Sequence, residues 1–357
     1  MNIIDGRDIL TIGCHFDPPR GGIAQVLYTY REEVFEHFQF VPNSGPGSNL
    51  RKLIIASCAY LHVCWLLLTN KRIRIVHIHT ASYNSFKRSA WFIRLAKAIG
   101  RKVVVHIHGG GFREYYQTNP KWILRILKKA DCIFALTDNW TRFYTDELRL
   151  ENVVTINNIV SNPQILQPKG KDERVHLLFL GFIIDQKGIF DLAEVIKMHE
   201  KEWEGKLLLH VGGDHEVERL KNYIKDNKLE NVIQYEGWVC GEKKIELMNL
   251  MDAFILPSYV EGLPISILEA LSYGKPIITT TVGGIPEVVN KENGFLFTPG
   301  DKEEMGNIIN EIITNPEGLR EKKISARNSV VQNSSENIAK TLKLIYKRLI
   351  EEDNRNE

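Results

Sequence analysis

Short apolar runs alternate with longer amphipathic segments along the chain, and this alternation constrains the fold more than any other feature of the sequence. The runs have the length of strands, and the segments between them have helical spacing. Strands that alternate with helices predict parallel sheets covered on both faces. Two such series therefore predict an α/β protein with two doubly wound domains. The predicted strands are 10–14, 73–79, 103–108, 132–136 and 153–156, then 176–180, 207–211, 232–235, 253–256, 276–279 and 294–297.

The alternation is interrupted once, over residues 157–174 (NNIVSNPQILQPKGKDER), which contain two prolines, a glycine and mixed charge. We expect a linker there. The length of 357 residues suits two domains at roughly 150 residues each. We predict an N-terminal domain over 1–160, a second domain over 161–335, and a C-terminal helix over 336–357 that packs back toward the first. The apolar stripe of that helix is Ile338, Leu342, Ile345 and Leu349.

The composition is that of an ordinary globular protein, with 43% hydrophobic and 25% charged residues. Its five cysteines are never spaced as Cys-x-x-Cys, which favours reduced thiols in the cytoplasm. No signal peptide is recognisable at the N-terminus. The most apolar stretch, 53–68, has about 16 residues against the ~20 that a bilayer requires, so we predict a buried helix there.

The net charge of +2 hides an asymmetry. Residues 1–160 carry 21 basic and 12 acidic side chains (21 − 12 = +9), and the remainder carries 25 and 32 (25 − 32 = −7). Segments 87–102 and 121–129 supply much of the positive charge as basic amphipathic helices. Their expected apolar faces are Trp91, Leu95 and Ile99 in the first and Trp122, Ile123, Ile126 and Leu127 in the second. They suit an anionic membrane surface, or are surface helices whose apolar face lies in the core. No nucleic-acid-binding module is recognisable, so we expect no nucleic-acid partner.

The strongest motif is YVEGLPISILEALSYG, which follows the predicted strand 253–256. Glu261 stands in a turn with Gly262, and Glu269 lies inside the helix that follows. Pro264 suits the first turn of that helix, where no amide donor is lost. The free amides of a helix N-terminus bind anions such as phosphate. We therefore expect a phosphate-binding site here; the alternative for Glu269 is an exposed helical carboxylate.

Two further motifs follow strands of the second half. In LGFIIDQKG, Lys187 stands at a junction between a loop and a helix, which suits a phosphate ligand or an ordinary surface lysine. Gly283 and Gly284 permit close approach of the backbone to a ligand, or form a tight turn.

The first half holds two glycine-rich loops. In PPRGGIA, Gly22 feeds a helix but lacks the spacing of a dinucleotide-binding fingerprint, which argues against an NAD-dependent enzyme. In HIHGGGF, His108 ends a strand and suits hydrogen bonding or acid–base work, or a structural turn. His77, His79 and His106 are interpreted as structural. No ligand spacing or Asp-x-Asp pair supports a metal site.

Taken together, these motifs resemble those of the retaining glycosyltransferases of family 4, which have the GT-B fold of two Rossmann-like domains facing a central cleft. The resemblance spans nearly the whole chain and is strongest over 175–297, where the motifs follow one another in the family order. It implies the transfer of a sugar from a nucleotide-diphosphate sugar to a hydroxyl of a saccharide or lipid-linked saccharide, with retention, in bacterial surface polysaccharide biosynthesis. It implies no metal or other cofactor, and a cytoplasmic protein, peripheral on the inner face of the membrane. The alternatives are a nucleotide-sugar epimerase or an inverting transferase of the same fold.

The resemblance also implies residue roles. Glu269 resembles the carboxylate that binds the donor ribose, and Glu261 the residue that faces the donor sugar. Lys187 resembles the diphosphate ligand, and His108 the first-domain histidine near the reacting sugar. The remaining expected donor contacts are Gly22, Gly262, Leu263, Pro264 and the backbone near Val239.

One position departs from the family pattern. Phe182 stands where members usually have an arginine after the glycine that ends the strand. Either another basic side chain takes the place of this arginine, or the binding of the donor phosphates depends more on helix N-termini.

Overall fold

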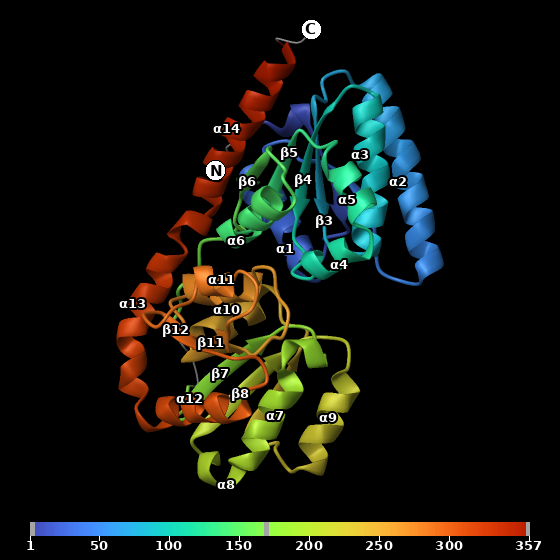
Figure 1. The fold of residues 1–357 in the computed structure, drawn as a ribbon. Coiled ribbons are helices and arrows are strands. Elements are labelled where there is room, and N and C mark those ends of the chain that lie inside the picture. Colours follow the sequence, from blue (N-terminus) through green and yellow to red (C-terminus); the bar gives the residue numbers. More distant parts are fainter. Residues whose placement is uncertain (1–3, 168–170, 355–357) are drawn as a thin grey trace. The chain divides into compact units, whose positions relative to one another are not determined.

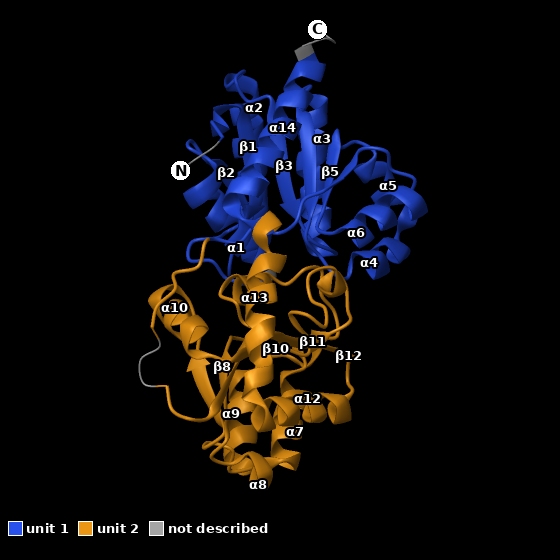
Figure 2. Ribbon diagram, turned by 90° about the vertical axis from the view of Figure 1, so that its left-hand side faces the viewer, with its two compact units in different colours: residues 1–161, 333–357 blue, residues 162–332 orange. Residues whose placement is uncertain are grey.

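The computed structural model describes residues 4–167 and 171–354 (Figure 1). Its contacts divide the chain into two compact units (Figure 2). The first comprises Met1–Ser161 and Asn333–Glu357, and the second comprises Asn162–Gln332. The boundary lies inside the segment where the alternation of strands and helices is interrupted.

The first unit contains a parallel sheet in the order β2-β1-β3-β4-β5-β6. Its strands are β1 (Ile9–Cys14), β2 (Gln39–Ser44), β3 (Ile75–Thr80), β4 (Lys102–Ile107), β5 (Cys132–Ala135) and β6 (Val153–Thr155). Its helices are α1 (Gly22–Thr29), α2 (Asn49–Thr69), α3 (Asn84–Ala98), α4 (Phe112–Thr118), α5 (Pro120–Leu127), α6 (Asp138–Arg142) and α14 (Ser335–Asn354).

The second unit contains a parallel sheet in the order β12-β11-β10-β7-β8-β9. Its strands are β7 (Val175–Leu180), β8 (Leu207–Gly212), β9 (Ile233–Gly237), β10 (Ala253–Leu256), β11 (Ile277–Thr280) and β12 (Gly294–Phe297). Its helices are α7 (Ile189–Met198), α8 (Glu200–Trp203), α9 (Val217–Asp226), α10 (Gly241–Leu250), α11 (Ile265–Ser272), α12 (Lys302–Thr314) and α13 (Leu319–Ser329). Every residue of β7, β8, β10 and β11 is buried, as expected for strands covered on both faces.

The predicted α/β class and the two doubly wound sheets are confirmed, and each predicted run overlaps a strand. The strand β2 escapes the sequence analysis because Pro42 interrupts it. Proline removes a backbone donor and is tolerated at the edge of a sheet, which is where β2 lies.

The last helix, α14, belongs to the first unit. Its predicted apolar stripe is buried, and Tyr346 Oη lies 2.8 Å from Nδ1 of His77 in β3. Near its C-terminal end, Arg74 donates to Asp353 at 2.8 Å. The chain therefore returns to the first sheet after completing the second.

The prediction of a buried helix over 53–68 is wrong for one face. The helix α2 is longer than the apolar run, with 21 residues, and only its inner face, with Ala56, Val63 and Leu67, is buried. Among the described residues, the stretch Leu50–Thr69 is the one helix whose length and hydropathy suit a membrane span. Only 22% of its most apolar part is buried inside the structure. Both faces of α2 are apolar, so periodicity does not reveal which one packs.

The expected pattern of α3 also needs a correction. Trp91 was expected on the apolar face opposite the basic residues, but it is exposed between Lys87 and Arg94, one helical turn from each. In α5 the expected pattern holds, because Ile123, Ile126 and Leu127 are buried.

Candidate active site

The strand order of the second sheet reverses between β7 and β10, which are neighbours although β8 and β9 lie between them in sequence. In open α/β sheets, ligands bind outside the carboxyl ends of the strands at such a switch point. The loops that follow β7 and β10 contain Lys187 and Glu261 respectively. The topology therefore brings together two residues that are 74 positions apart.

Lys187 is held by a turn of fixed geometry. It ends a short 3₁₀ helix, Asp185–Lys187, and Gly188 follows in the left-handed conformation with φ of +69°. A Cβ atom at Gly188 would lie 2.1 Å from the carbonyl oxygen of Pro257, so only glycine fits. The amide of Tyr259 donates to the carbonyl of Gln186 at 2.9 Å and joins the two loops.

Glu261 is largely buried, and one of its oxygens accepts two hydrogen bonds. Lys187 Nζ lies 2.5 Å from Glu261 Oε1, and Ser258 Oγ donates to the same oxygen at 2.7 Å. The lysine side chain remains partly exposed while the carboxylate is nearly enclosed. The ammonium group is thus the more accessible partner of the pair.

The paired glycines after β11 support the loop of Glu261. Gly283 has φ of +58°, and a Cβ atom there would lie 2.0 Å from the carbonyl oxygen of Glu261. The amide of Gly284 donates to the carbonyl of Gly262 at 2.6 Å. The close approach expected of these glycines is therefore made to the backbone of residues 261–262.

Pro264 precedes α11 in an extended conformation, with φ of −66° and ψ of 125°, and provides no side-chain cap. Leu263 beside it is buried. An N-terminus without a capping side chain leaves its first amides to other acceptors, including anions. The start of α11 lies in the same loop as Glu261 and Gly262.

Glu269, in the second turn of α11, does not contact Lys187 in the structure. Its partner is Lys244 of α10, whose Nζ lies 2.7 Å from Glu269 Oε1. Burial opposes the charge of Lys244, but the neighbouring carboxylate outweighs it and raises the pKa of Lys244. The ion pair fixes the position of the Glu269 carboxylate.

Val239 follows β9 and lies against the end of β8. A Cβ atom on Gly212 would lie 2.6 Å from Val239 Cγ2. The expected contact near the nucleotide base thus lies at the same carboxyl edge of the second sheet.

Phe182, at the position of the missing arginine, packs against His215, with ring centroids 4.2 Å apart. His215 is exposed and has a φ of +92°, which is strained for a residue other than glycine. The nearby Arg219 is held by Asp185 at 2.9 Å and Glu216 at 2.7 Å, so its charge is already balanced. His215 is therefore the basic residue type that lies directly against the position of the missing arginine.

The two remaining predicted residues lie in the first unit. Gly22 opens α1, directly after Gly21, whose φ is +92°. His108 follows β4, and its Nε2 lies 3.0 Å from Nδ1 of His79. Burial lowers the pKa of His108 to about 3, although a hydrogen bond with Asn158 acts in the opposite direction. At neutral pH the imidazole is thus uncharged.

His77, His79 and His106 form a buried group behind His108. Their potential ligand nitrogens all lie within 4.8 Å of one another, so they are a candidate for binding a metal ion. Two of them, however, have hydrogen-bonding neighbours in Tyr346 and His108. Our interpretation of the group remains structural.

The structure thus brings Lys187, Glu261 and Gly262 into one contact network and places Glu269 in a separate ion pair. Sequence reasoning missed Ser258 and Lys244. Ser258 lies between strand β10 and the strongest motif, and its place in the loop was a usable signal. Lys244 stands in the first turn of a helix with two other charged residues and carries no distinguishing signal.

Comparison with known families identifies the class of protein. A model of glycosyl transferases group 1 matches residues 161–336, and a model of a glycosyl transferase 4-like domain matches residues 27–158. The chain is a glycosyltransferase. The expectation of a sugar-transferring enzyme is confirmed.

Relatives of this transferase include an uncharacterized glycosyltransferase of Haemophilus influenzae, 29% identical over 194 residues, which are 53% of this chain and 53% of that protein. A lipopolysaccharide 1,6-galactosyltransferase of Salmonella typhimurium is 27% identical over 168 residues, 45% of this chain and 46% of that one. The matches thus span about half the length of these relatives. The solved structure of Anabaena HepE in complex with UDP-glucose superposes with a TM-score of 0.75 at 17% identity, covering 95% of this chain and 99% of that one. This likeness confirms the predicted GT-B architecture.

Proposed function

We propose that this transferase moves a sugar from a nucleotide-diphosphate sugar to a hydroxyl of a saccharide or lipid-linked saccharide, with retention of the anomeric configuration. One observation carries the proposal: Lys187, Ser258 and Glu261 meet at the switch point of the second sheet. The uncapped start of α11 follows in the same loop. An ammonium group and helix amides are the groups with which proteins bind diphosphates without a metal.

The chemistry explains why a cation is needed there. Cleavage of the bond between the anomeric carbon and the diphosphate builds negative charge on the leaving phosphate and positive charge on the sugar. In our proposal, Lys187 leaves Glu261 when the donor binds and neutralises the diphosphate. Glu261 then faces the donor sugar, with Gly262, Leu263 and Pro264 beside it. Loss of one such stabilising contact typically costs a hundredfold or more in rate.

The remaining donor contacts are proposed from the family resemblance and the local geometry. Glu269 accepts hydrogen bonds from the ribose hydroxyls, and Lys244 orients its carboxylate. The backbone near Val239 contacts the base. For the first unit, the family resemblance assigns Gly22 to the phosphates and His108 to the reacting sugar.

For the donor, we propose a uridine diphosphate sugar, because HepE has the same fold and its structure contains UDP-glucose. No metal is invoked, since Lys187 and the helix amides supply the positive charge. Chelation with EDTA is therefore expected to leave activity unchanged.

For the acceptor, we propose a lipid-linked saccharide of bacterial surface polysaccharide synthesis at the cytoplasmic face of the membrane. The Salmonella relative is a lipopolysaccharide galactosyltransferase, which favours this class of acceptor. The basic segments 87–102 and 121–129 suit an anionic surface.

The proposal is tested by incubating the enzyme with UDP, GDP and ADP sugars, with and without saccharide acceptors. We expect product only with acceptor, and NMR of its anomeric proton reports retention. Glu261→Gln and Glu269→Gln should each lower the rate by about a hundredfold, whereas the exposed Glu218→Gln serves as the matched control. Product without acceptor supports an epimerase instead, and an inverted anomeric centre refutes retention.

A further inference from the structure

The outer face of α2 is apolar and exposed. Leu61 is 70% exposed, Trp65 60% and Leu68 62%. Leu50, Leu53 and Ile54 extend the same face toward the N-terminus of the helix. Large apolar side chains at this spacing form a continuous stripe about five turns long. A stripe of this size on a globular protein marks a contact surface.

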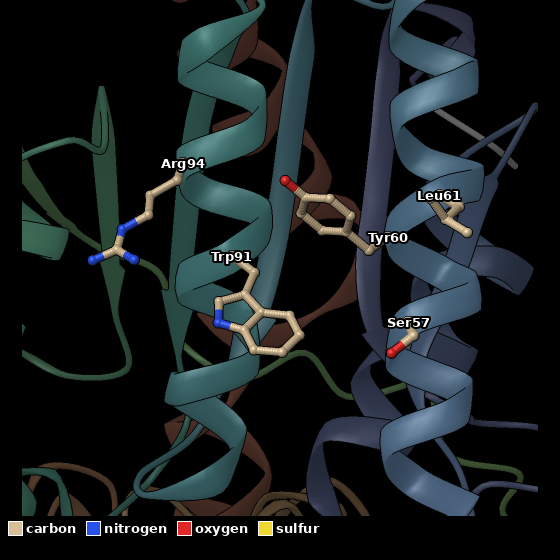
Figure 3. Close-up of a pocket in the computed structure, with 5 residues that line it drawn as sticks. All are labelled: Ser57, Tyr60, Leu61, Trp91 and Arg94. Atoms are coloured by element: carbon tan, nitrogen blue, oxygen red, sulfur yellow. The ribbon is translucent and has the colours of Figure 1, made fainter.

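The stripe continues onto the neighbouring helix α3. Tyr60 and Trp91 lie edge to face between the two helices, with ring centroids 6.5 Å apart. Together with Ser57, Leu61 and Arg94 they line a shallow groove of about 460 Å³ (Figure 3). We call the stripe and this groove the α2–α3 face.

The chain segment that forms this face carries charge of one sign. The sequence contains no Asp or Glu between Glu36 and Glu114, and twelve Lys and Arg lie in that interval. Some of them are neutralised from outside it, as Lys97 is by Asp131. Lys71, Lys87 and Arg94 are exposed at the ends and side of the face and belong to no ion pair that the described residues reveal. An apolar stripe whose own chain segment carries cations and no carboxylate complements an anionic lipid surface.

We propose that the α2–α3 face is a membrane-docking surface that lies in the plane of an anionic lipid bilayer. The apolar side chains of α2 enter the boundary between headgroups and acyl chains, Trp65 and Trp91 sit at headgroup level, and the bordering bases contact lipid phosphates. Helix α2 does not cross the bilayer, because its inner face packs on its own unit through Ala56, Val63 and Leu67.

The α2–α3 face brings a lipid-linked acceptor to the enzyme, and in that respect this role rests on the proposed function. The membrane contact thus moves from the basic helices alone to α2. Vesicle binding is measured without any sugar substrate, so its failure is distinguishable from a failure of glycosyl transfer.

The test is co-sedimentation of the full chain with vesicles of phosphatidylcholine, alone or mixed with phosphatidylglycerol. We expect binding to the anionic vesicles that weakens with salt, with a blue shift of tryptophan fluorescence that Trp65→Phe diminishes. The double variant Leu61→Gln/Trp65→Gln should lose at least tenfold in vesicle affinity. Its matched control is Ile324→Gln/Leu344→Gln, at two other exposed apolar positions (70% and 71%), which should bind like the parent.

Charge is tested separately with Lys87→Gln/Arg94→Gln, which should lower the affinity for anionic vesicles and reduce its salt dependence. The proposal is overturned if Leu61→Gln/Trp65→Gln binds vesicles as tightly as Ile324→Gln/Leu344→Gln. The proposal is also overturned if the parent binds no vesicles and forms a dimer without lipid that Leu61→Gln/Trp65→Gln dissociates. That result assigns the face to a second copy of the chain.

Discussion

The buried histidines of the first unit predict that this unit loses stability in mild acid. Burial, reinforced by the neighbouring histidines, lowers the pKa of His77, His79 and His106 well below the usual value. The unfolded chain therefore binds protons below about pH 6.5 that the folded chain excludes. The stability of the unit is full above that pH and decreases as the pH falls.

The size of this loss of stability is set by the pKa of histidine in the unfolded chain. Between pH 7 and pH 5, a histidine with an unfolded pKa of 6.5 that stays neutral when folded costs about 2 kcal/mol. Three such groups together cost about 6 kcal/mol, against a typical domain stability of about 5–15 kcal/mol. The first unit should therefore be close to unfolding at pH 5.

Hydrogen exchange read by mass spectrometry measures this loss separately for each strand. We expect the opening free energy of peptides from β3 and β4 to fall steeply between pH 7 and pH 5, after correction for intrinsic exchange. In His106→Phe, which removes one titrating ring and keeps an aromatic group against Phe134, the fall should be smaller by about 2 kcal/mol. An unchanged opening free energy, or the same fall in this variant, would refute the reasoning.

Three further predictions concern the second unit and the histidine cluster. Gly188→Ala should destabilise the second unit by more than Gly205→Ala does. Both glycines have positive φ, but of the two only Gly188 has no room for a Cβ atom. Urea unfolding measures the difference in unfolding free energy, which we expect to be about 1–3 kcal/mol. His215→Ala should weaken nucleotide-sugar binding severalfold by calorimetry if His215 replaces the missing arginine, and unchanged affinity rejects that role. Elemental analysis of the purified protein should find no stoichiometric metal, whereas one bound ion per chain that His106→Phe removes would assign the histidine cluster to metal binding.

The fold could be predicted from sequence because the central strands of both sheets are buried on both faces. Such strands are continuous apolar runs: the run at 253–256 coincides with β10, and the run at 207–211 lies within β8. Pro42 hid β2, since proline argues against a strand unless the edge position is known. The outer face of α2 was missed for a different reason: an apolar helix has the same pattern whether its second face meets protein or another apolar phase.

The candidate site was predictable where local chemistry identifies it. Lys187 and Glu261 each follow a strand, and parallel strands place such residues at one edge. Their direct contact depends on which strands are neighbours, which a sequence pattern does not specify. The ion pair of Lys244 with Glu269 joins two helices, α10 and α11, that are separate in the sequence, so no local signal reveals it.

The central claim is that the switch point of the second sheet binds the diphosphate of a nucleotide sugar through Lys187. Isothermal titration calorimetry of UDP against the parent, Lys187→Met and the exposed control Lys221→Met tests it directly. We expect the parent and Lys221→Met to bind UDP alike and Lys187→Met to bind at least tenfold more weakly. Equal affinity of all three proteins for UDP would contradict the claim.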